Sequence, residues 1–330
     1  MNLIETQNFA ENLAKKAGVF LLKNFGKSKI AVQKGKNDFA TDADLASEKL
    51  IIREIKKAFP GDGILAEESL ENFESQSRNW IIDPLDGTKN FHFGLPNWCI
   101  SIALQENGES IIGVVFSPIS GQLFSARKGG GAKLNGQKIH VSQTAKLDET
   151  MIVVEIPRRH TSGKRFAKDI CSFTDSLNKV RRVRAFAAAA YDLCLVANGS
   201  VDGYLDFSRN TKIWDIAAGT LIVREAGGKV ADVTLPNLKF PNISILASNK
   251  KLHSKFRELL GRRNFPCQTP VHFFIIPRTR PPIVVRNFDD IGQLRSRDFE
   301  DFGKWPDTLN PVNHLRRNVK NLAGFQNFIF

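Results

Sequence analysis

The chain has 330 residues, of which 42% are hydrophobic and 25% charged, a composition that excludes wholesale disorder, a collagen-like repeat and a small disulfide scaffold. Lysine and arginine outnumber aspartate and glutamate by 47 to 34, and the resulting net charge of +13 favours polyanionic or phosphorylated ligands by long-range attraction. A basic surface that is merely solvated explains the same charge equally well, so the charge alone identifies no partner.

The four cysteines, Cys99, Cys171, Cys194 and Cys267, are widely spaced and form no Cys-x-x-Cys pair. This distribution predicts buried free thiols in a reducing compartment and no thiolate zinc site. The first sixteen residues include acidic side chains and no apolar core, and no run of about 18 apolar residues occurs in the chain. We therefore expect neither a secretory signal nor a membrane span, and a cytoplasmic protein.

Two amphipathic helices are predicted at the start of the chain. Apolar side chains recur at helical spacing over residues 3–25, and the pattern ends near Gly26. The second helix begins at Thr41, where Thr41 and Asp44 resemble a capping box. A strand-rich region follows, with a hairpin predicted around Asn107-Gly108. Its six short apolar runs lie at 64–66, 80–82, 99–105, 111–116, 122–126 and 139–141.

Strands and helices alternate in the next part of the chain. We expect the first 261 residues to form one domain with two lobes, roughly 1–150 and 151–261. In the second lobe, strands are expected at 151–156, 229–233 and 244–247, and helices at 187–197, 214–225 and 249–260.

The composition changes after Gly261. Residues 262–330 hold 7 of the 14 prolines, 9 of the 25 phenylalanines, and 11 basic against 6 acidic residues, with no clear helical or strand period. This basic, Phe/Pro-rich C-terminal extension is a small extra subdomain, a docking tail or a poorly ordered segment, and its composition favours the last of these.

Three acidic clusters stand at the ends of predicted elements. Glu67 and Glu68 follow the first of the short strands, the segment Asp83–Thr88 follows the second, and Asp215 opens a later helix. Carboxylates without basic neighbours repel one another, and a divalent cation would relieve that repulsion. Ligands that are all oxygen favour Mg²⁺ or Mn²⁺ over Zn²⁺.

The second acidic cluster is built as a stiff ligand loop. Pro84 fixes φ and has no N–H, and Gly87 permits tight backbone geometry. Asp83 and Asp86 can then face one site together, with the Leu85 carbonyl as a further ligand. Taken singly, the three clusters also have simpler explanations, namely a solvated acidic pair, a surface turn and a helix cap.

The order and spacing of these clusters resemble the signatures of the inositol monophosphatase family. The resemblance runs from the N-terminus to about Leu260, and the extension after Gly261 has no counterpart in it. It implies an α/β (α+β) fold, a layered α-β-α-β-α sandwich of the sugar phosphatase type. It also implies a homodimer, two or three Mg²⁺ ions, lithium sensitivity and hydrolysis of a small phosphate monoester. The matching segments are Gly61–Ser69, Trp80–Phe91 and Trp214–Gly219.

The resemblance assigns roles by position in these motifs. Glu68 would support the metal site, and Thr88 would orient the attacking water with Asp42 as its hydrogen-bond partner. The expected catalytic residues are therefore Glu67, Thr88 and Asp42. Metal-activated water would attack phosphorus in line, so neither a side-chain nucleophile nor a phospho-enzyme is expected. The expected metal ligands are the side chains of Glu67, Asp83, Asp86 and Asp215 and the carbonyl of Leu85.

The substrate side of the resemblance departs from the family in two places. Asp206 resembles an acidic residue that binds substrate hydroxyls, but two extra residues separate it from Trp214; an ordinary strand-end aspartate is the alternative. The family usually has Gly-Ser or Gly-Thr before the Ala-Ala pair whose N–H groups face the substrate, whereas Ala187 stands there in this chain. The expected substrate contacts are Gly87, Thr88, Asp206, Ala188 and Ala189.

Two basic runs keep other functions open. Arginine suits phosphate recognition, so a bisphosphate such as fructose 1,6-bisphosphate is one alternative, and a solvated face is the simpler one. An RNA-binding or scaffold protein on a phosphatase fold would also use the positive charge, but the RNP-type aromatic motif is absent. We therefore predict an Mg²⁺-dependent phosphatase most similar to inositol-1-phosphatase, and expect no nucleic-acid or membrane partner. The runs are Arg158, Arg159, Lys164 and Arg165, and Arg181, Arg182 and Arg184.

Overall fold

The chain divides into two compact units. Residues 1–157 and 176–261 form the first, which contains every expected catalytic, metal-binding and substrate-contact residue, and residues 158–175 and 262–330 form the second. In the described part of the second unit, two short strands that the composition did not predict, β15 (Phe273–Ile275) and β16 (Ile283–Val285), pair antiparallel. The rest of the C-terminal extension, with its predicted lack of order, lies outside the described residues, and the predicted two-lobe division stays a prediction. The computed structural model describes residues 2–35, 38–69, 76–156, 174, 178–208, 211–232, 245–261, 273–275 and 283–285.

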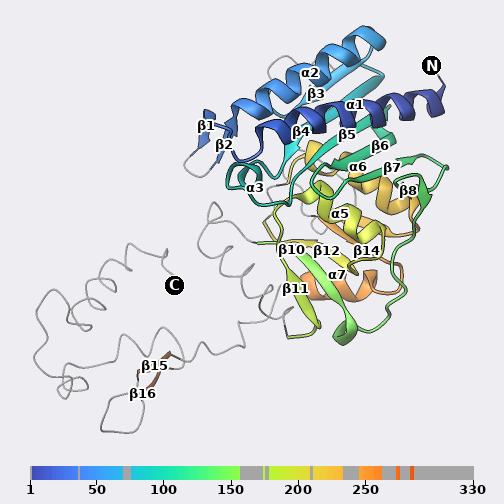
Figure 1. Ribbon diagram of the computed structural model, residues 1–330. Coiled ribbons are helices and arrows are strands. Elements are labelled where there is room, and N and C mark those ends of the chain that lie inside the picture. The colour runs from blue at the N-terminus through green and yellow to red at the C-terminus, as the bar shows by residue number, and fades with distance from the viewer. Residues whose placement is uncertain are drawn as a thin grey trace, which may run out of the picture. The chain divides into compact units, whose positions relative to one another are not determined.

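Two helices and a seven-stranded sheet form the first layers of the first unit. Helices α1 (Leu3–Asn24) and α2 (Asp42–Ala58) cover one face of the sheet (Figure 1). Their apolar stripes pack with that face in one core cluster, in which Trp80 and Ile100 are fully buried. The sheet is antiparallel apart from its first, parallel pair. In spatial order its strands are β3 (Gly63–Ala66), β4 (Arg78–Asp86), β5 (Cys99–Glu106), β6 (Glu109–Ser117), β7 (Gln122–Arg127), β8 (Ala132–Leu134) and β9 (Gln137–Lys138).

Helices α5 (Ala189–Ala197) and α6 (Ile213–Glu225) pack in a second core cluster with both this sheet and a smaller one. Helix α7 (His253–Gly261) lies on the outer face of the smaller sheet (Figure 1). The sequence of layers is therefore helix, sheet, helix, sheet, helix, and the predicted fold class is confirmed. The smaller sheet is mixed and has the order β11 (Arg182–Arg184), β10 (Met151–Glu155), β12 (Gly203–Asp206), β14 (Ile245–Ser248) and β13 (Lys229–Asp232).

Local sequence signals explain where the first elements begin and turn. The predicted capping box of α2 is confirmed, since Thr41 N donates to Asp44 Oδ2 at 2.9 Å and Asp44 N donates to Thr41 Oγ1. The hairpin between β5 and β6 is also confirmed. Asn107 and Gly108 have φ values of 51° and 80°, the left-handed conformation that such a two-residue turn requires.

Two other local predictions differ from the structure. The strand predicted at 139–141 is wrong, because the chain leaves the sheet after β9 and Val141 N donates instead to the Ala226 carbonyl at 3.2 Å. Strands β1 (Ile30–Gly35) and β2 (Asp38–Thr41) form an antiparallel pair that was not predicted. Every residue of β1 is exposed, so no alternation of apolar and polar side chains marks it as a strand. Two further short elements are α3 (Thr88–His92) and a 3₁₀ turn (Leu147–Glu149).

Strand β4 departs from the prediction in a way that shapes the site. The sequence predicts a strand that ends at Asp83 and then turns, whereas β4 continues to Asp86. Its pairing with β5 shifts between these two aspartates, where β4 has one residue more than its partner. This is a β-bulge, and a bulge tolerates Pro84 in a central strand because the proline has no N–H to pair.

Close packing of α6 against the large sheet brings a third aspartate to this bulge. A Cβ atom built on Gly113 of β6 would lie 2.7 Å from the carbonyl oxygen of Ala218, so the approach requires glycine. Ser101 of β5 donates a hydrogen bond of 3.1 Å to a backbone carbonyl in the first turn of α6. Because Ser101 pairs with Asp83 across the ladder, the first turn of α6, which carries Asp215, lies next to the bulge.

Candidate active site

The two aspartates of the β4 bulge are buried and held by backbone donors. Asp83 and Asp86 are 2% and 8% exposed. Oδ1 of Asp83 accepts a hydrogen bond from Leu85 N at 2.9 Å, which closes the bulge. Oδ2 of Asp86 accepts from Ala190 N at 2.8 Å, and Cys99 Sγ lies 3.6 Å from the same oxygen. These contacts fix both carboxylates on rigid elements.

Two further carboxylates reach the bulge from other elements. Asp215, in the first turn of α6, accepts at Oδ2 a hydrogen bond of 2.7 Å from the backbone N–H three residues before it. Glu67 directly follows β3, and its N–H donates to the backbone of β4 at 3.2 Å. Burial raises the pKa of Asp83 well above its usual value, and the charges of Glu67, Asp86 and Asp215 raise it further. The four side chains predicted to bind metal are thus within electrostatic range of one another.

This cluster is costly when all of its members are ionised. Burial raises the pKa of Asp86 to about 7, although the hydrogen bonds from Ala190 and Cys99 oppose the shift. Burial also raises the pKa of Asp215 well above its usual value, and the charges of Asp86 and Glu67 add to that effect. Low dielectric and like charge disfavour the same ionised form. A divalent cation among these carboxylates would offset both effects.

A lysine that no sequence motif marks adds positive charge at the edge of the cluster. Nζ of Lys34, on β1, lies 2.8 Å from Oε1 of Glu67 and 2.7 Å from Oε1 of Glu68. Burial would lower the pKa of Lys34, but the two carboxylates outweigh burial and raise it. Burial raises the pKa of Glu68 to about 7, Glu67 adds to the shift, and Lys34 opposes it. Nothing local in the sequence marks this lysine, because its position depends on the pairing of β1 with β2.

The donor atoms fit Mg²⁺ or Mn²⁺. They are carboxylate and carbonyl oxygens, the ligands that these hard cations prefer, and the ammonium group of Lys34 between two carboxylates already stands where positive charge is favoured. Within the described ranges, no three His, Cys, Asp or Glu side chains are arranged as a metal cluster; the carboxylates bind backbone N–H groups and Lys34 instead. The residues that would hold the ions are Glu67, Asp83, Asp86 and Asp215, with the carbonyl of Leu85.

Thr88 binds a different aspartate from the predicted one. Its Oγ1 lies 2.8 Å from Oδ1 of Asp44 and 3.0 Å from the carbonyl oxygen of Leu85. The prediction of Asp42 as its partner is wrong, since Asp42 is exposed and accepts a hydrogen bond from Lys29 N at 3.0 Å. The reason is helical geometry: residues two apart point about 200° apart around a helix, so that only one of the two aspartates faces the sheet. The capping box is the sequence signal that could have identified Asp44.

The backbone around Gly87 and the start of α5 is tightly packed. Gly87 has a φ of 86°, and a Cβ atom there would lie 2.8 Å from the carbonyl oxygen of Asn97 and 3.3 Å from Cβ of Ala188. Gly87, Ala188 and the first helical residue, Ala189, are therefore close together. Ala187 has a φ of 57°, a left-handed conformation that costs an alanine about 1–2 kcal/mol. The backbone conformation suited to glycine is thus kept although the glycine is absent.

Asp206 is engaged by its own loop. It is fully buried at the end of β12. Its Oδ1 accepts hydrogen bonds from N and Oγ of Ser208, both at 2.7 Å, and its Oδ2 accepts one from Thr211 Oγ1, also at 2.7 Å. This geometry favours the alternative of a strand-end aspartate that orders the loop, and a contact with substrate stays a prediction.

Another carboxyl group near the site is buried without a hydrogen-bond partner among the described residues. Asp192, in α5, is fully buried, and neither of its oxygens is bonded. Burial raises the pKa of Asp192 well above its usual value, and the charges of Asp86 and Glu155 raise it further. Burial and these neighbouring charges both disfavour the ionised form of Asp192.

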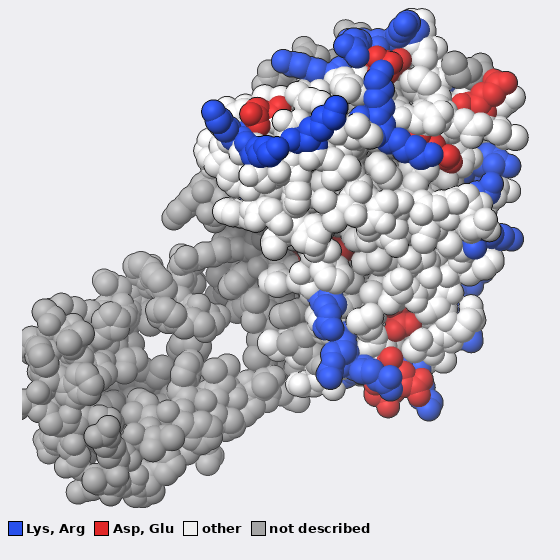
Figure 2. All heavy atoms as spheres, viewed as in Figure 1, with Lys and Arg blue, Asp and Glu red and all other residues white. Residues whose placement is uncertain are grey.

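Basic side chains gather around β11 and over α1 and α2 on the face seen in Figure 2. Arg181, Arg182 and Arg184 are exposed on and beside this edge strand, and within the part of the chain that the structure describes none of them is in an ion pair. The surface formed by these three residues is called the arginine edge below. The other predicted basic run, at 158–165, lies outside the described residues.

The predicted free thiols are present where the structure describes them. Cys99 and Cys194 are buried and unpaired by disulfides, and Cys171 and Cys267 lie outside the described residues. Among the helices of the described residues, none combines the length and the apolar character that crossing a membrane requires.

Known proteins resemble this chain in sequence and in structure. The model of the inositol monophosphatase family matches residues 2–263. A Nus factor SuhB from Xylella fastidiosa is 41% identical over 229 residues, which cover 68% of this chain and 81% of that protein. An inositol-1-monophosphatase from Mesorhizobium japonicum is 37% identical over 247 residues, 74% of this chain and 91% of that protein. The crystal structure of the extragenic suppressor protein SuhB from Bartonella henselae superposes with a TM-score of 0.73 at 36% identity, covering 78% of this chain and 99% of that one.

Proposed function

Since the chain belongs to the inositol monophosphatase family, we propose that it is an Mg²⁺-dependent phosphatase that hydrolyses a small phosphate monoester. The observation that best supports this proposal is that four carboxylates around the β4 bulge, those of Glu67, Asp83, Asp86 and Asp215, lie within electrostatic range of one another. A pure binding module has no use for buried acids that repel one another, whereas a phosphatase uses them to hold the cation that neutralises its substrate.

Several residues of the chain have separate roles in the proposed hydrolysis. Bound Mg²⁺ would supply Lewis acidity and lower the pKa of coordinated water. The Thr88 hydroxyl donates toward Oδ1 of Asp44, so its lone pairs are directed to accept a hydrogen bond from the attacking water. The lack of a Cβ at Gly87 lets the backbone of this residue approach Ala188, where both are expected to contact the phosphate, and Lys34 balances the charge at the edge of the cluster. No side chain acts as nucleophile, so no phospho-enzyme forms.

Inositol-1-phosphate is the substrate that we propose first. The relative from Mesorhizobium japonicum carries the name of that activity, and the left-handed conformation of Ala187 keeps the backbone path that a glycine would allow. Fructose 1,6-bisphosphate or another sugar or nucleotide phosphate is the alternative within the same reaction class. A bisphosphate substrate would need arginines to bind its second phosphate. The arginines of the arginine edge are exposed on the smaller sheet.

Phosphate release from a panel of esters tests this function. The full chain should release phosphate from inositol-1-phosphate with Mg²⁺ or Mn²⁺, stop when EDTA removes the cation, and slow down when Li⁺ is added. The panel should include fructose 1,6-bisphosphate and a nucleoside monophosphate. A strong preference for the bisphosphate would change the substrate, and no release from any ester in the presence of Mg²⁺ would contradict the phosphatase assignment.

A binding role is a second candidate, and the arginine edge is the observation that favours it. Its three arginines have no ion-pair partner among the described residues, and a relative with 41% identity is named a Nus factor. If the edge binds a phosphate backbone, a fluorescent RNA oligonucleotide should bind with an affinity that falls steeply with salt, and replacing all three arginines by Ser should flatten the slope. Phosphate release by that triple variant should stay at the wild-type rate. Salt-independent or undetectable RNA binding would remove this candidate.

The assembly and compartment that we propose follow the family. A homodimer is expected, and sedimentation of the full chain measures it. The buried free thiols of Cys99 and Cys194 are compatible with a reducing compartment, and we propose the cytoplasm. We propose no membrane partner.

A further inference from the structure

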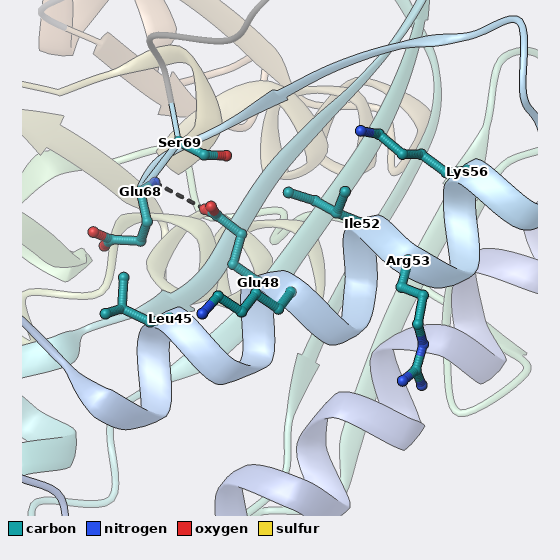
Figure 3. A pocket seen from close by; sticks show the side chains of 8 residues that line it. Leu45, Glu48, Ile52, Arg53, Lys56, Glu68 and Ser69 are labelled. Carbon is teal, nitrogen blue, oxygen red and sulfur yellow. Dashed lines mark hydrogen bonds between the residues drawn. The ribbon is translucent and has the colours of Figure 1, made fainter.

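Among the described residues, the segment that carries Glu67 is attached to the large sheet on one side only. Glu67, Glu68 and Ser69 follow β3, which is the edge strand of that sheet. The N–H of Glu67 makes the last hydrogen bond to β4. The next N–H, that of Glu68, donates instead to Oε2 of Glu48 on α2 at 2.8 Å, as Figure 3 shows. The backbone of this segment is thus hydrogen-bonded to the sheet at Glu67, an expected metal ligand, and to helix α2 at the next residue.

A glutamate side chain at position 48 is energetically costly to bury. It is 3% exposed, and burial raises its pKa while the charge of Glu67 adds to the shift. Hydrogen bonds from Glu68 N and the Ser69 side chain oppose the shift, as does the charge of Lys34. A leucine would fill the same space without desolvating a charge beside other carboxylates. What the carboxylate adds is an acceptor for the N–H of Glu68.

The same face of α2 also contacts the segment that carries the aspartates. Ser47 Oγ donates to the Pro84 carbonyl at 3.1 Å, and Asp44 accepts from Thr88. Positions 44, 47 and 48 lie on one side of a helix, so α2 holds the two ligand segments, 67–69 and 83–88, against one rigid element.

We propose that Glu48 is a positioning residue of the metal site. By accepting the N–H of Glu68, it holds Glu67 at the spacing from Asp83 and Asp86 at which their carboxylates share one cation. The inference rests on the proposed function only in that this site binds Mg²⁺ or Mn²⁺. Hydrogen-bonded supports of metal ligands are worth about 10- to 100-fold in metal affinity or activity.

Calorimetric titration of the full chain with Mn²⁺ tests this role without relying on turnover. Glu48→Leu removes the acceptor and should weaken Mn²⁺ binding about tenfold or more. Glu48→Gln keeps an acceptor oxygen and should restore most of the affinity. Glu48 lines a pocket of about 590 Å³ beside Leu45 and Ile52 (Figure 3), so a changed side chain has room. If Glu48→Leu does not fold, Glu48→Asp is measured instead. Its side chain is shorter by one methylene, which moves the acceptor away from the N–H of Glu68.

Matched controls separate this role from general stability. Ile55 is fully buried seven residues after Glu48 on α2, and Ile55→Val should lower the unfolding temperature but leave Mn²⁺ affinity unchanged. Wild-type Mn²⁺ affinity in Glu48→Leu would overturn the proposal, as would equal losses in Glu48→Gln and Glu48→Leu. If the wild-type chain binds Mn²⁺ but releases no phosphate, the proposed function fails while the role of Glu48 is still measured.

Discussion

Asp83→Asn is expected to lower Mg²⁺-dependent phosphate release by about 10²–10³-fold or more, the scale on which loss of one preorganised electrostatic group slows an enzyme. The substitution keeps the shape of the side chain, and an amide oxygen can still accept from Leu85 N, so the bulge is preserved. What it removes is the charge that would bind the cation. Asp215→Asn should have a loss of the same order, measured as initial rates at saturating Mg²⁺.

The stability of the same variant should change in the opposite direction. Burial and three neighbouring carboxylates raise the pKa of Asp83 in the folded chain, so the metal-free fold loses stability as the pH rises above the value at which this group ionises when unfolded. Asn has no such ionisation, and metal-free Asp83→Asn should therefore unfold at a higher temperature than the metal-free wild type at neutral pH. Adding Mg²⁺ should narrow or reverse this difference in unfolding temperature between the variant and the wild type.

The exposed Asp148 supplies a control for both measurements. Asp148→Asn should leave the rate and the unfolding temperature unchanged, because Asp148 is exposed in the 3₁₀ turn and belongs to none of the ligand segments. Near-normal turnover in Asp83→Asn or Asp215→Asn would contradict the active-site assignment. Loss of activity with loss of folding would be recognised from the melting curve.

Elements with a strong local signal could be predicted from the sequence. The Thr41–Asp44 capping box, the Asn107-Gly108 turn and the apolar stripe of α1 each depend on neighbouring residues, and each is present in the structure. The pair β1–β2 has no such signal because β1 is exposed throughout. The extension of β4 to Asp86 depends on its register with β5, which is a property of the sheet rather than of the segment.

The residues of the candidate site likewise fall into those that a local sequence signal predicts and those that it does not. The acidic clusters were visible because each carries several carboxylates at the end of an element, and the structure brings Glu67, Asp83, Asp86 and Asp215 within electrostatic range. Lys34 was missed because a single lysine on an unpredicted strand is indistinguishable from a surface lysine.

Asp44 and Glu48 were missed for a different reason. In the sequence, Asp44 is marked only as a capping residue and Glu48 only as a polar residue of an amphipathic helix. Their roles at the site come from the side of α2 that they share and from what that side contacts. Asp44 reaches Thr88 and Glu48 reaches Glu68, across 44 and 20 positions of sequence. Sequence spacing within α2 gives the shared face, but only the packed structure gives the two partners.

The paired substitutions Asp44→Asn and Asp42→Asn measure the correction to the partner of Thr88. Asp44→Asn should lower kcat about 100-fold, because an amide has only one acceptor oxygen for the Thr41 N–H and the Thr88 hydroxyl, and an NH₂ group turned toward Thr88 would donate to the oxygen that should accept from water. Asp42→Asn should stay within about twofold of the wild type, since Asp42 is exposed and binds only a backbone N–H among the described residues. The substrate KM should change little in either variant, because neither side chain is expected to contact the leaving group.

Substitutions of Thr88 separate the chemical role of Asp44 from its role in capping α2. Thr88→Val keeps the shape and removes the hydroxyl, so it should reproduce most of the kcat loss of Asp44→Asn without touching the cap; Thr88→Ser should keep activity within about tenfold. If Thr88 acts through Asp44, the double variant Asp44→Asn/Thr88→Val should be scarcely slower than either single variant. Fully multiplicative losses, or a large loss in Asp42→Asn, would show that the two residues do not work as a pair.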